Sequence, residues 1–234
     1  MAGRMPVSMS LPDEFLALFD WMDTNGFFMR SAAYPGDLLG LLGTEGQVQA
    51  GRVTAILFRV STSEQARENG QDWFGEVVPN IEERLVPFAR TGGDGSYVAF
   101  WLDDDGNRRI VHLGSEGRVC RIGQTPLDFL RLLAIGYDEV SGDCLDAPGE
   151  PPAGHALNAA YRNWLIESYG VTIPATASEI LGTIPDVLAE KWMIHSGAGC
   201  ARLRPSGIPG RDYRRKVLCF ATRLPAGFSG KITS

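Results

Sequence analysis

The chain has 234 residues, of which 44% are hydrophobic and 21% charged, and its formal net charge is −6. This composition can bury a core of ordinary size and suits one domain, or one domain with an appendage. Its apolar runs are much shorter than the roughly 20 residues that a membrane-spanning helix needs, and residues 1–10 lack the apolar stretch of a secretory signal. We therefore expect a cytoplasmic protein that does not enter a membrane.

Charge is unevenly distributed along the sequence. Residues 201–234 contain eight basic residues and one acid, so the rest of the chain is strongly acidic. An acidic body repels nucleic acid and attracts basic protein surfaces, and we expect a partner of the second kind. Proline and glycine interrupt the basic tail, which predicts a flexible or loosely docked terminus. The tail could alternatively bind an acidic partner or nucleic acid.

The first predicted element is a helix that begins near Pro12. Proline suits the first turn of a helix, and the acids Asp13 and Glu14 suit its positive end. Asn25-Gly26 ends the helix, because glycine can adopt the left-handed cap. Between these signals, apolar residues recur at helical spacing and mark one buried face: Phe15, Leu18, Phe19 and Met22.

The next part of the chain has weaker patterning. Residues 38–42 predict a strand or a short turn and strand, and residues 53–60, rich in β-branched and aromatic side chains, predict another strand. Residues 61–84 are polar and predict a short helix and a loop.

Residues 85–122 carry the clearest architecture. Val86-Pro87-Phe88 predicts a loop end or a short edge strand, because proline cannot donate a hydrogen bond to the sheet. Residues 97–102 are apolar on both faces of a strand, which indicates a central strand covered on both sides. An acidic hairpin loop follows at 103–107. Residues 108–113 then pair back, and residues 118–122 could add a strand.

A capped helix closes this unit. Thr125 is the expected N-cap, Pro126 the first helical residue and Asp128 a shorter stand-in for the capping-box glutamate. Gly136 ends the helix.

The remaining sequence predicts an appendage. Residues 141–154, rich in glycine and proline, predict a linker. Helical spacing over 155–169, capped by Gly170, and short helical pieces over 174–181 and 184–194 predict further helices. We therefore expect an α+β fold, a twisted, mostly antiparallel sheet packed by helices, with a C-terminal helical extension. Its predicted divisions are a core at 1–140, the linker at 141–154, the extension packed on the core at 155–200 and the basic tail at 201–234.

The sequence contains no recognisable catalytic or metal-binding constellation. The histidines, at 112, 155 and 195, are far apart and lack metal-ligand spacing. Ser115 and Ser196 miss the nucleophile-elbow pattern, and the glycine-rich turn at 92–95 lacks the lysine of a phosphate loop. The four cysteines are irregularly spaced, which predicts reduced thiols. We predict a binding protein with no catalytic residue, no metal and no cofactor, and an enzyme with an unfamiliar site remains the alternative.

Acidic loop residues are the candidates for partner contacts, because loops beside a rigid sheet are good contact sites. The triplet at 103–105 can also be read as a solvated hairpin tip or as a divalent-cation site, although it lacks the alternating ligands and distal glutamate of a calcium loop. The candidate partner-binding residues are Asp94, Asp103, Asp104, Asp105 and Glu116.

Three motifs, in order, resemble the SUKH superfamily, which groups a fungal cell-wall-assembly regulator with many bacterial immunity proteins. The opening at 11–15 with Asn25-Gly26 is similar to the family's "LP–aromatic helix–NG" start. Residues 86–89, followed by 93–97, are similar to its "PFA…GDG-aromatic" signature. Residues 126–130 are similar to its terminal helix. The resemblance covers roughly residues 11–136, and neither the extension nor the basic tail has a counterpart in it.

The resemblance implies an α+β fold and non-catalytic protein binding. Most bacterial members are thought to neutralise a toxin made by the same or a neighbouring cell. The leading hypothesis is therefore an immunity protein that binds a cognate toxin, through a basic surface of that toxin, and occludes its active site. The alternative is a regulatory scaffold that organises partner proteins. The family carries no catalytic residues to transfer, and its motif positions are expected to be structural.

Overall fold

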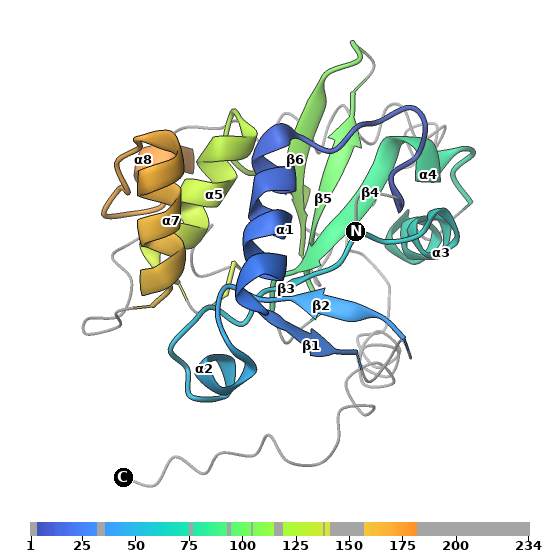
Figure 1. Cartoon of the computed structure of the whole chain (residues 1–234). Helices are drawn as coiled ribbons and strands as arrows, with labels where there is room; N and C mark the ends of the chain where they lie inside the picture. Colours follow the sequence, from blue (N-terminus) through green and yellow to red (C-terminus); the bar gives the residue numbers. More distant parts are fainter. Residues whose placement is uncertain are drawn as a thin grey trace, which may run out of the picture.

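The computed structural model describes residues 4–31, 36–74, 77–92, 95–103, 105–114, 119–137, 139–140 and 157–181. These residues form an α+β fold with a seven-stranded antiparallel sheet in the order β1-β2-β3-β4-β5-β6-β7 (Figure 1). The expected fold class is confirmed. Of the predicted elements, the linker at 141–154, the piece at 184–194 and the tail at 201–234 lie outside the described residues.

The strands follow one another along the chain and pair with their sequence neighbours. They are β1 (Phe28–Arg30), β2 (Leu38–Gly40), β3 (Leu57–Phe58), β4 (Leu85–Arg90), β5 (Tyr97–Leu102), β6 (Arg108–Leu113) and β7 (Val119–Arg121). The helices are α1 (Asp13–Asn25), α2 (Glu45–Gln49), α3 (Ser63–Phe74), α4 (Ile81–Arg84), α5 (Pro126–Ile135), α7 (Ala159–Tyr169) and α8 (Ser178–Leu181).

The centre of the sheet differs from the prediction at β4. This strand pairs with both β3 and β5, so it is not a loop end or an edge strand. Proline is tolerated there because the β4–β5 register shifts between Pro87 and Ala89. The carbonyl of Pro87 also accepts a hydrogen bond from the Ser61 backbone N–H at 2.8 Å. The proline therefore sits at an irregularity and keeps its acceptor in use.

Two further elements depart from the sequence prediction. Only Leu57–Phe58 of the expected strand at 53–60 is a strand, and the polar segment after it forms the twelve-residue helix α3 rather than a short one. Strand β1 was not predicted, and it forms one edge of the sheet beside β2. Short strands depend on partners elsewhere in the chain, so their own residues carry a weak signal.

Both faces of the sheet are covered, as the pattern of β5 predicted. Val98 and Phe100 belong to the larger core cluster, which α1, α5, α7 and α8 cover (Figure 1). Ala99 and Trp101 point to the other face and belong to a smaller cluster that includes Ile81 of α4. Because successive side chains of a strand point to opposite faces of the sheet, the apolar residues of β5 are divided between the two clusters.

Four phenylalanines hold α1 and α5 on the larger core. The ring of Phe15 in α1 lies 4.9 Å from Phe88 in β4, 5.0 Å from Phe100 in β5 and 6.0 Å from Phe129 in α5, measured between centroids. All four side chains are fully buried. Phe15, Phe88 and Phe129 belong to segments that resemble the SUKH motifs, and here they build the core together with Phe100.

The predicted caps of α1 and α5 are confirmed. Gly26 ends α1 with φ of 65°. The Thr125 hydroxyl accepts from the Asp128 N–H at 3.2 Å, and the Asp128 carboxylate accepts from the Thr125 N–H at 3.0 Å. This reciprocal pair satisfies two backbone donors at the start of α5.

Helices α7 and α8 pack against the core and lie beside α5. Tyr161 is completely buried, and its hydroxyl donates to the Leu130 carbonyl of α5 at 2.9 Å. Asn158, just before α7, is also fully buried. Its side chain bonds Thr54 and the carbonyl of Leu133, which ties the start of α7 to two distant segments.

Candidate protein-binding surface

The hairpin acid Asp103 has a structural role. Its carboxylate accepts from the Asn107 backbone N–H at 2.7 Å, and its own N–H donates to the Asn107 carbonyl at 2.9 Å. Gly106 completes the turn with φ of 77°. The side chain also forms an ion pair with Arg109 Nε at 3.0 Å. Asp103 therefore closes the β5–β6 hairpin, and its charge is already balanced.

The pKa of Asp103 is consistent with this role. Burial opposes the charged form, but the Asn107 N–H and the Arg109 guanidinium outweigh it and lower the pKa. Of the other predicted partner-binding acids, Asp105 is exposed at the hairpin tip. Asp94, Asp104 and Glu116 lie outside the described residues, so only Asp103 and Asp105 are brought together here.

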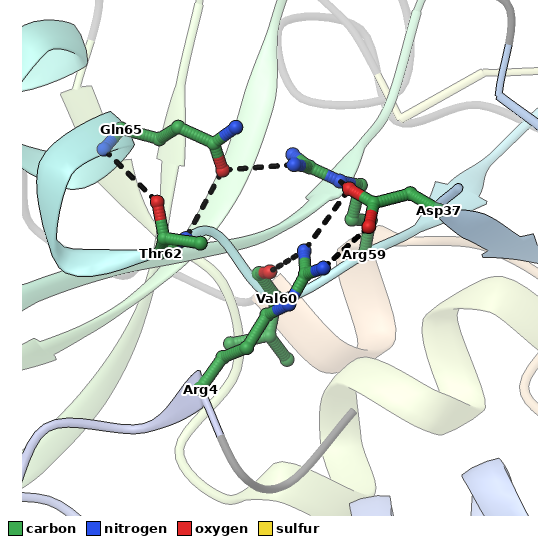
Figure 2. A network of polar contacts seen from close by, with 6 residues as sticks. All are labelled: Arg4, Asp37, Arg59, Val60, Thr62 and Gln65. Carbon is green, nitrogen blue, oxygen red and sulfur yellow. Dashed lines mark hydrogen bonds and ion pairs between the residues drawn. The ribbon is translucent and has the colours of Figure 1, made fainter. Parts of the chain in front are cut away.

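A polar network joins the N-terminal segment to the sheet (Figure 2). Asp37 lies between two guanidinium groups, with Arg4 Nη2 at 2.5 Å from Oδ1 and Arg59 Nε at 2.7 Å from Oδ2. Arg4 also donates to the Val60 carbonyl at 3.3 Å. The hydrogen bonds from Arg4 and Arg59 lower the pKa of Asp37 to about 2. The carboxylate is therefore charged under ordinary conditions and fastens residue 4 to β2 and β3.

The same network caps α3. The Gln65 Oε1 atom accepts from Arg59 Nη2 at 2.9 Å and from the Thr62 N–H at 3.1 Å. The Thr62 hydroxyl accepts from the Gln65 N–H at 3.3 Å (Figure 2). The groups joined by dashed lines in Figure 2 bond one another within the chain. We interpret this cluster as a clasp that positions α3, not as a ligand site.

One hollow lined by described residues is too small for an ordinary ligand. A hollow beside β6 and the start of α5, lined by Arg108, Ile122 and Thr125 among others, encloses about 10 Å³. That is about the space that one water molecule needs and far below an ordinary ligand pocket. Within the described ranges, no group of three or more histidine, cysteine or acidic side chains could hold a metal ion. His112 lies buried in β6, and His155 and His195 are outside these ranges.

Cys120 is in the thiol form in β7, and the other three cysteines lie outside the described residues. Among the helices whose placement is described, none combines the length and the apolar character needed to cross a bilayer.

A different part of the molecule gathers acids on a rigid element. Helix α1 contains four acids and no basic residue. Asp13 and Asp20 are exposed, and Glu14 is half-buried. Helical spacing places these three carboxylates around the small residue Ala17, at i−4, i+3 and i−3. The buried face of α1 fixes their positions, because its phenylalanines are locked into the core.

Beside these acids runs a row of half-buried aromatic rings from three elements. Trp21 of α1 stacks on Trp164 of α7, with centroids 5.3 Å apart and planes inclined by 28°. Phe27, after α1, contacts Trp21 at 5.1 Å. Tyr169 at the end of α7 contacts Trp164 at 6.1 Å. We call Asp13, Glu14, Asp20, Trp21, Phe27, Trp164 and Tyr169 the acidic–aromatic surface.

The acids and the aromatic row are electrostatically connected. Partial burial raises the pKa of the Tyr169 hydroxyl, and the negative charges of Glu14 and Asp13 raise it further. Tyr169 ends α7, whereas Asp13 and Glu14 lie in the first turn of α1, so the two helices are antiparallel. The N-terminal end of α1 therefore places negative potential over the end of the aromatic row.

The sequence prediction missed this surface. The acids at the start of α1 were read only as helix-end charges, and Trp21 and Trp164 lie too far apart in sequence for spacing to connect them. One signal was present: α1 carries acids on its polar face without the compensating lysine or arginine of an ordinary solvated helix.

Comparison with known proteins gave no match: no family model, no curated protein and no solved structure matches the chain.

Proposed function

We propose that this chain is a non-catalytic immunity protein that binds a cognate toxin inside the producing cell and occludes the toxin's active site. The resemblance of residues 11–136 to the SUKH superfamily is one source of support. The residues of that resemblance that lie in the described ranges serve as caps, turns and core rings, in agreement with a scaffold role.

The observation that carries the proposal is the acidic–aromatic surface. Protein-binding sites favour tryptophan, tyrosine and phenylalanine, which bury large areas at a low entropic cost. Acids around the aromatic row add electrostatic steering toward a basic partner. Helices α1 and α7 present both features on elements that are anchored in one core, so the surface is preorganised and binding need not order it.

Two polar clusters away from this surface have structural roles. The clasp around Asp37 and the closed hairpin at Asp103 use their charged groups internally. Both clusters therefore stabilise the scaffold.

Co-expression with the product of the adjacent gene tests this proposal. An immunity protein restores growth when that product alone arrests it, and the two proteins co-purify as a stable complex. Purified chain added to the purified toxin should abolish the toxin's activity at a molar ratio near one. Unrelieved growth arrest, or turnover of a substrate by the chain alone, would contradict the proposal.

A further inference from the structure

We propose that the acidic–aromatic surface receives an arginine-bearing segment of the partner protein, with guanidinium groups lying on Trp21 and Trp164 and pairing with Asp13, Glu14 and Asp20. This inference deepens the proposed function and rests on it for the identity of the partner. The chemistry of the segment follows from the surface itself.

The aromatic part of the surface favours a flat cation. Trp21 and Trp164 stack on each other, and each remains half-buried, so part of each indole reaches the surface. Indole faces attract cations, and guanidinium groups stack on them more readily than ammonium groups do. Tyr169 and Phe27 lengthen the row at its two ends. An extended segment could therefore place more than one cation along it.

The acidic part supplies the second half of the recognition. Asp13, Glu14 and Asp20 make no ion pair with any residue of the described ranges, in contrast to Asp37 and Asp103. The nearest basic influence is Arg108 of β6, whose pKa is lowered by burial and held up by the charges of Glu14 and Asp13. Their carboxylates surround Ala17, whose short side chain leaves them accessible. A guanidinium that binds a carboxylate with two parallel hydrogen bonds gains both energy and orientation. A carboxylate beside an indole can thus hold an arginine that the ring also contacts.

The negative charge of this surface favours a basic polypeptide over other ligands that bind rows of aromatic side chains. Exposed bases of single-stranded nucleic acid stack on such rings, but those sites line the backbone path with basic residues. Here α1 has no basic residue, and α7 has only Arg162. An anionic membrane surface would be repelled in the same way. The complementary partner is a basic polypeptide.

A matched pair of variants tests the surface without disturbing the core. Asp13→Asn with Asp20→Asn removes two exposed charges from α1. Glu64→Gln with Glu68→Gln removes two exposed charges from α3, which lies on the opposite side of the molecule (Figure 1). Both double variants have the same net charge. Circular dichroism and melting curves, unchanged from the parent chain, show that both remain folded.

Calorimetric titration of the full chain with deca-arginine and deca-lysine gives the readout. The parent chain should bind deca-arginine about fivefold more tightly than deca-lysine, since stacking on indole distinguishes the two cations. The α1 variant should lose about tenfold in affinity for deca-arginine, and the α3 variant less than about twofold. Trp164→Leu should reduce the preference for arginine over lysine.

Three results would overturn the proposal. Equal losses in the α1 and α3 variants would mean general attraction to an acidic protein. An equal affinity for both peptides would remove the role of the indoles. A peptide of residues 211–216 of this chain, RDYRRK, that displaces deca-arginine at lower concentration would assign the surface to the chain's own basic segment. These results leave the growth-rescue test unaffected, so the surface and the proposed function can fail independently.

Discussion

Replacing Asn158 tests how α7 is held in place, and so whether the acidic–aromatic surface is preorganised. The Asn158 Oδ1 atom accepts from the Thr54 N–H at 2.9 Å, and Nδ2 donates to Thr54 Oγ1 at 2.6 Å and to the Leu133 carbonyl at 2.8 Å. The residue is fully buried and has φ of 59°. Asparagine is one of the few residues that combine a left-handed backbone with such side-chain bonds.

The expected cost of Asn158→Ala follows from these contacts. Two buried backbone groups, the Thr54 N–H and the Leu133 carbonyl, lose their side-chain partner, at about 1–3 kcal/mol each. The hydroxyl of Thr54 keeps its bond to the Tyr137 carbonyl. Alanine in the left-handed conformation adds about 1 kcal/mol. We therefore predict that the free energy of unfolding falls by about 3–7 kcal/mol.

Urea unfolding followed by tryptophan fluorescence and by circular dichroism measures this loss. Asn158→Gly is the matched control, since glycine removes the backbone strain and the hydrogen bonds at once. It should recover about 1 kcal/mol relative to alanine. A loss below about 1 kcal/mol for the alanine variant would refute the reasoning, because it would mean that these bonds do not hold α7. Equal stability of the two variants would refute the strain component.

Three further predictions address the clasp, the α5 turn and the hairpin. The folded pKa of Asp37 is lowered from 3.8 to about 2, so its contribution is present above pH 4 and is lost as the pH falls toward 2. Urea titrations should show that Asp37→Asn removes this pH dependence and costs about 1 kcal/mol at neutral pH after screening by solvent. In the same assay, Gly123→Ala should lower the free energy of unfolding by about 3 kcal/mol, because Gly123 has φ of +71° and the added Cβ would lie 2.6 Å from the Asp128 Cβ. The control Gly46→Ala, in open space within α2, should be neutral or stabilising. Asp103→Ala should lower the melting temperature by several degrees, because it opens the turn and leaves Arg109 unpaired. Asp105→Ala at the same hairpin tip should leave the melting temperature unchanged. A larger loss for Asp105→Ala than for Asp103→Ala would contradict the structural role of Asp103.

Local signals in the sequence predicted the elements whose caps and turns are self-contained. The Thr125–Asp128 capping box, the Gly26 cap and the hairpin loop at 103–107 each depend on residues within five positions. The two-sided burial of β5 was also readable, because its apolar residues occupy both strand faces. Strand β4 was misplaced because its tolerance of Pro87 depends on a register shift against β5, which no local pattern records.

The candidate site was less accessible to sequence reasoning. Asp103 looked like part of an exposed acidic cluster, yet the Asn107 N–H and Arg109 engage it once the hairpin forms. The acidic–aromatic surface needs Trp21 and Trp164 to meet across the α1–α7 packing. That meeting depends on Tyr161 and Asn158, whose partners lie in α5 and near residue 54. Tertiary packing, rather than spacing, creates the surface.

The affinity of the full chain for the product of the adjacent gene, which we propose to be its cognate toxin, tests the central claim most directly. We predict a tight one-to-one complex in which the toxin is inactive. Asp13→Asn with Asp20→Asn should lower the affinity of this complex by about tenfold, and Glu64→Gln with Glu68→Gln should change that affinity by less than about twofold. A complex that is insensitive to the α1 variant, or a toxin that stays active when saturated with the chain, would contradict the account.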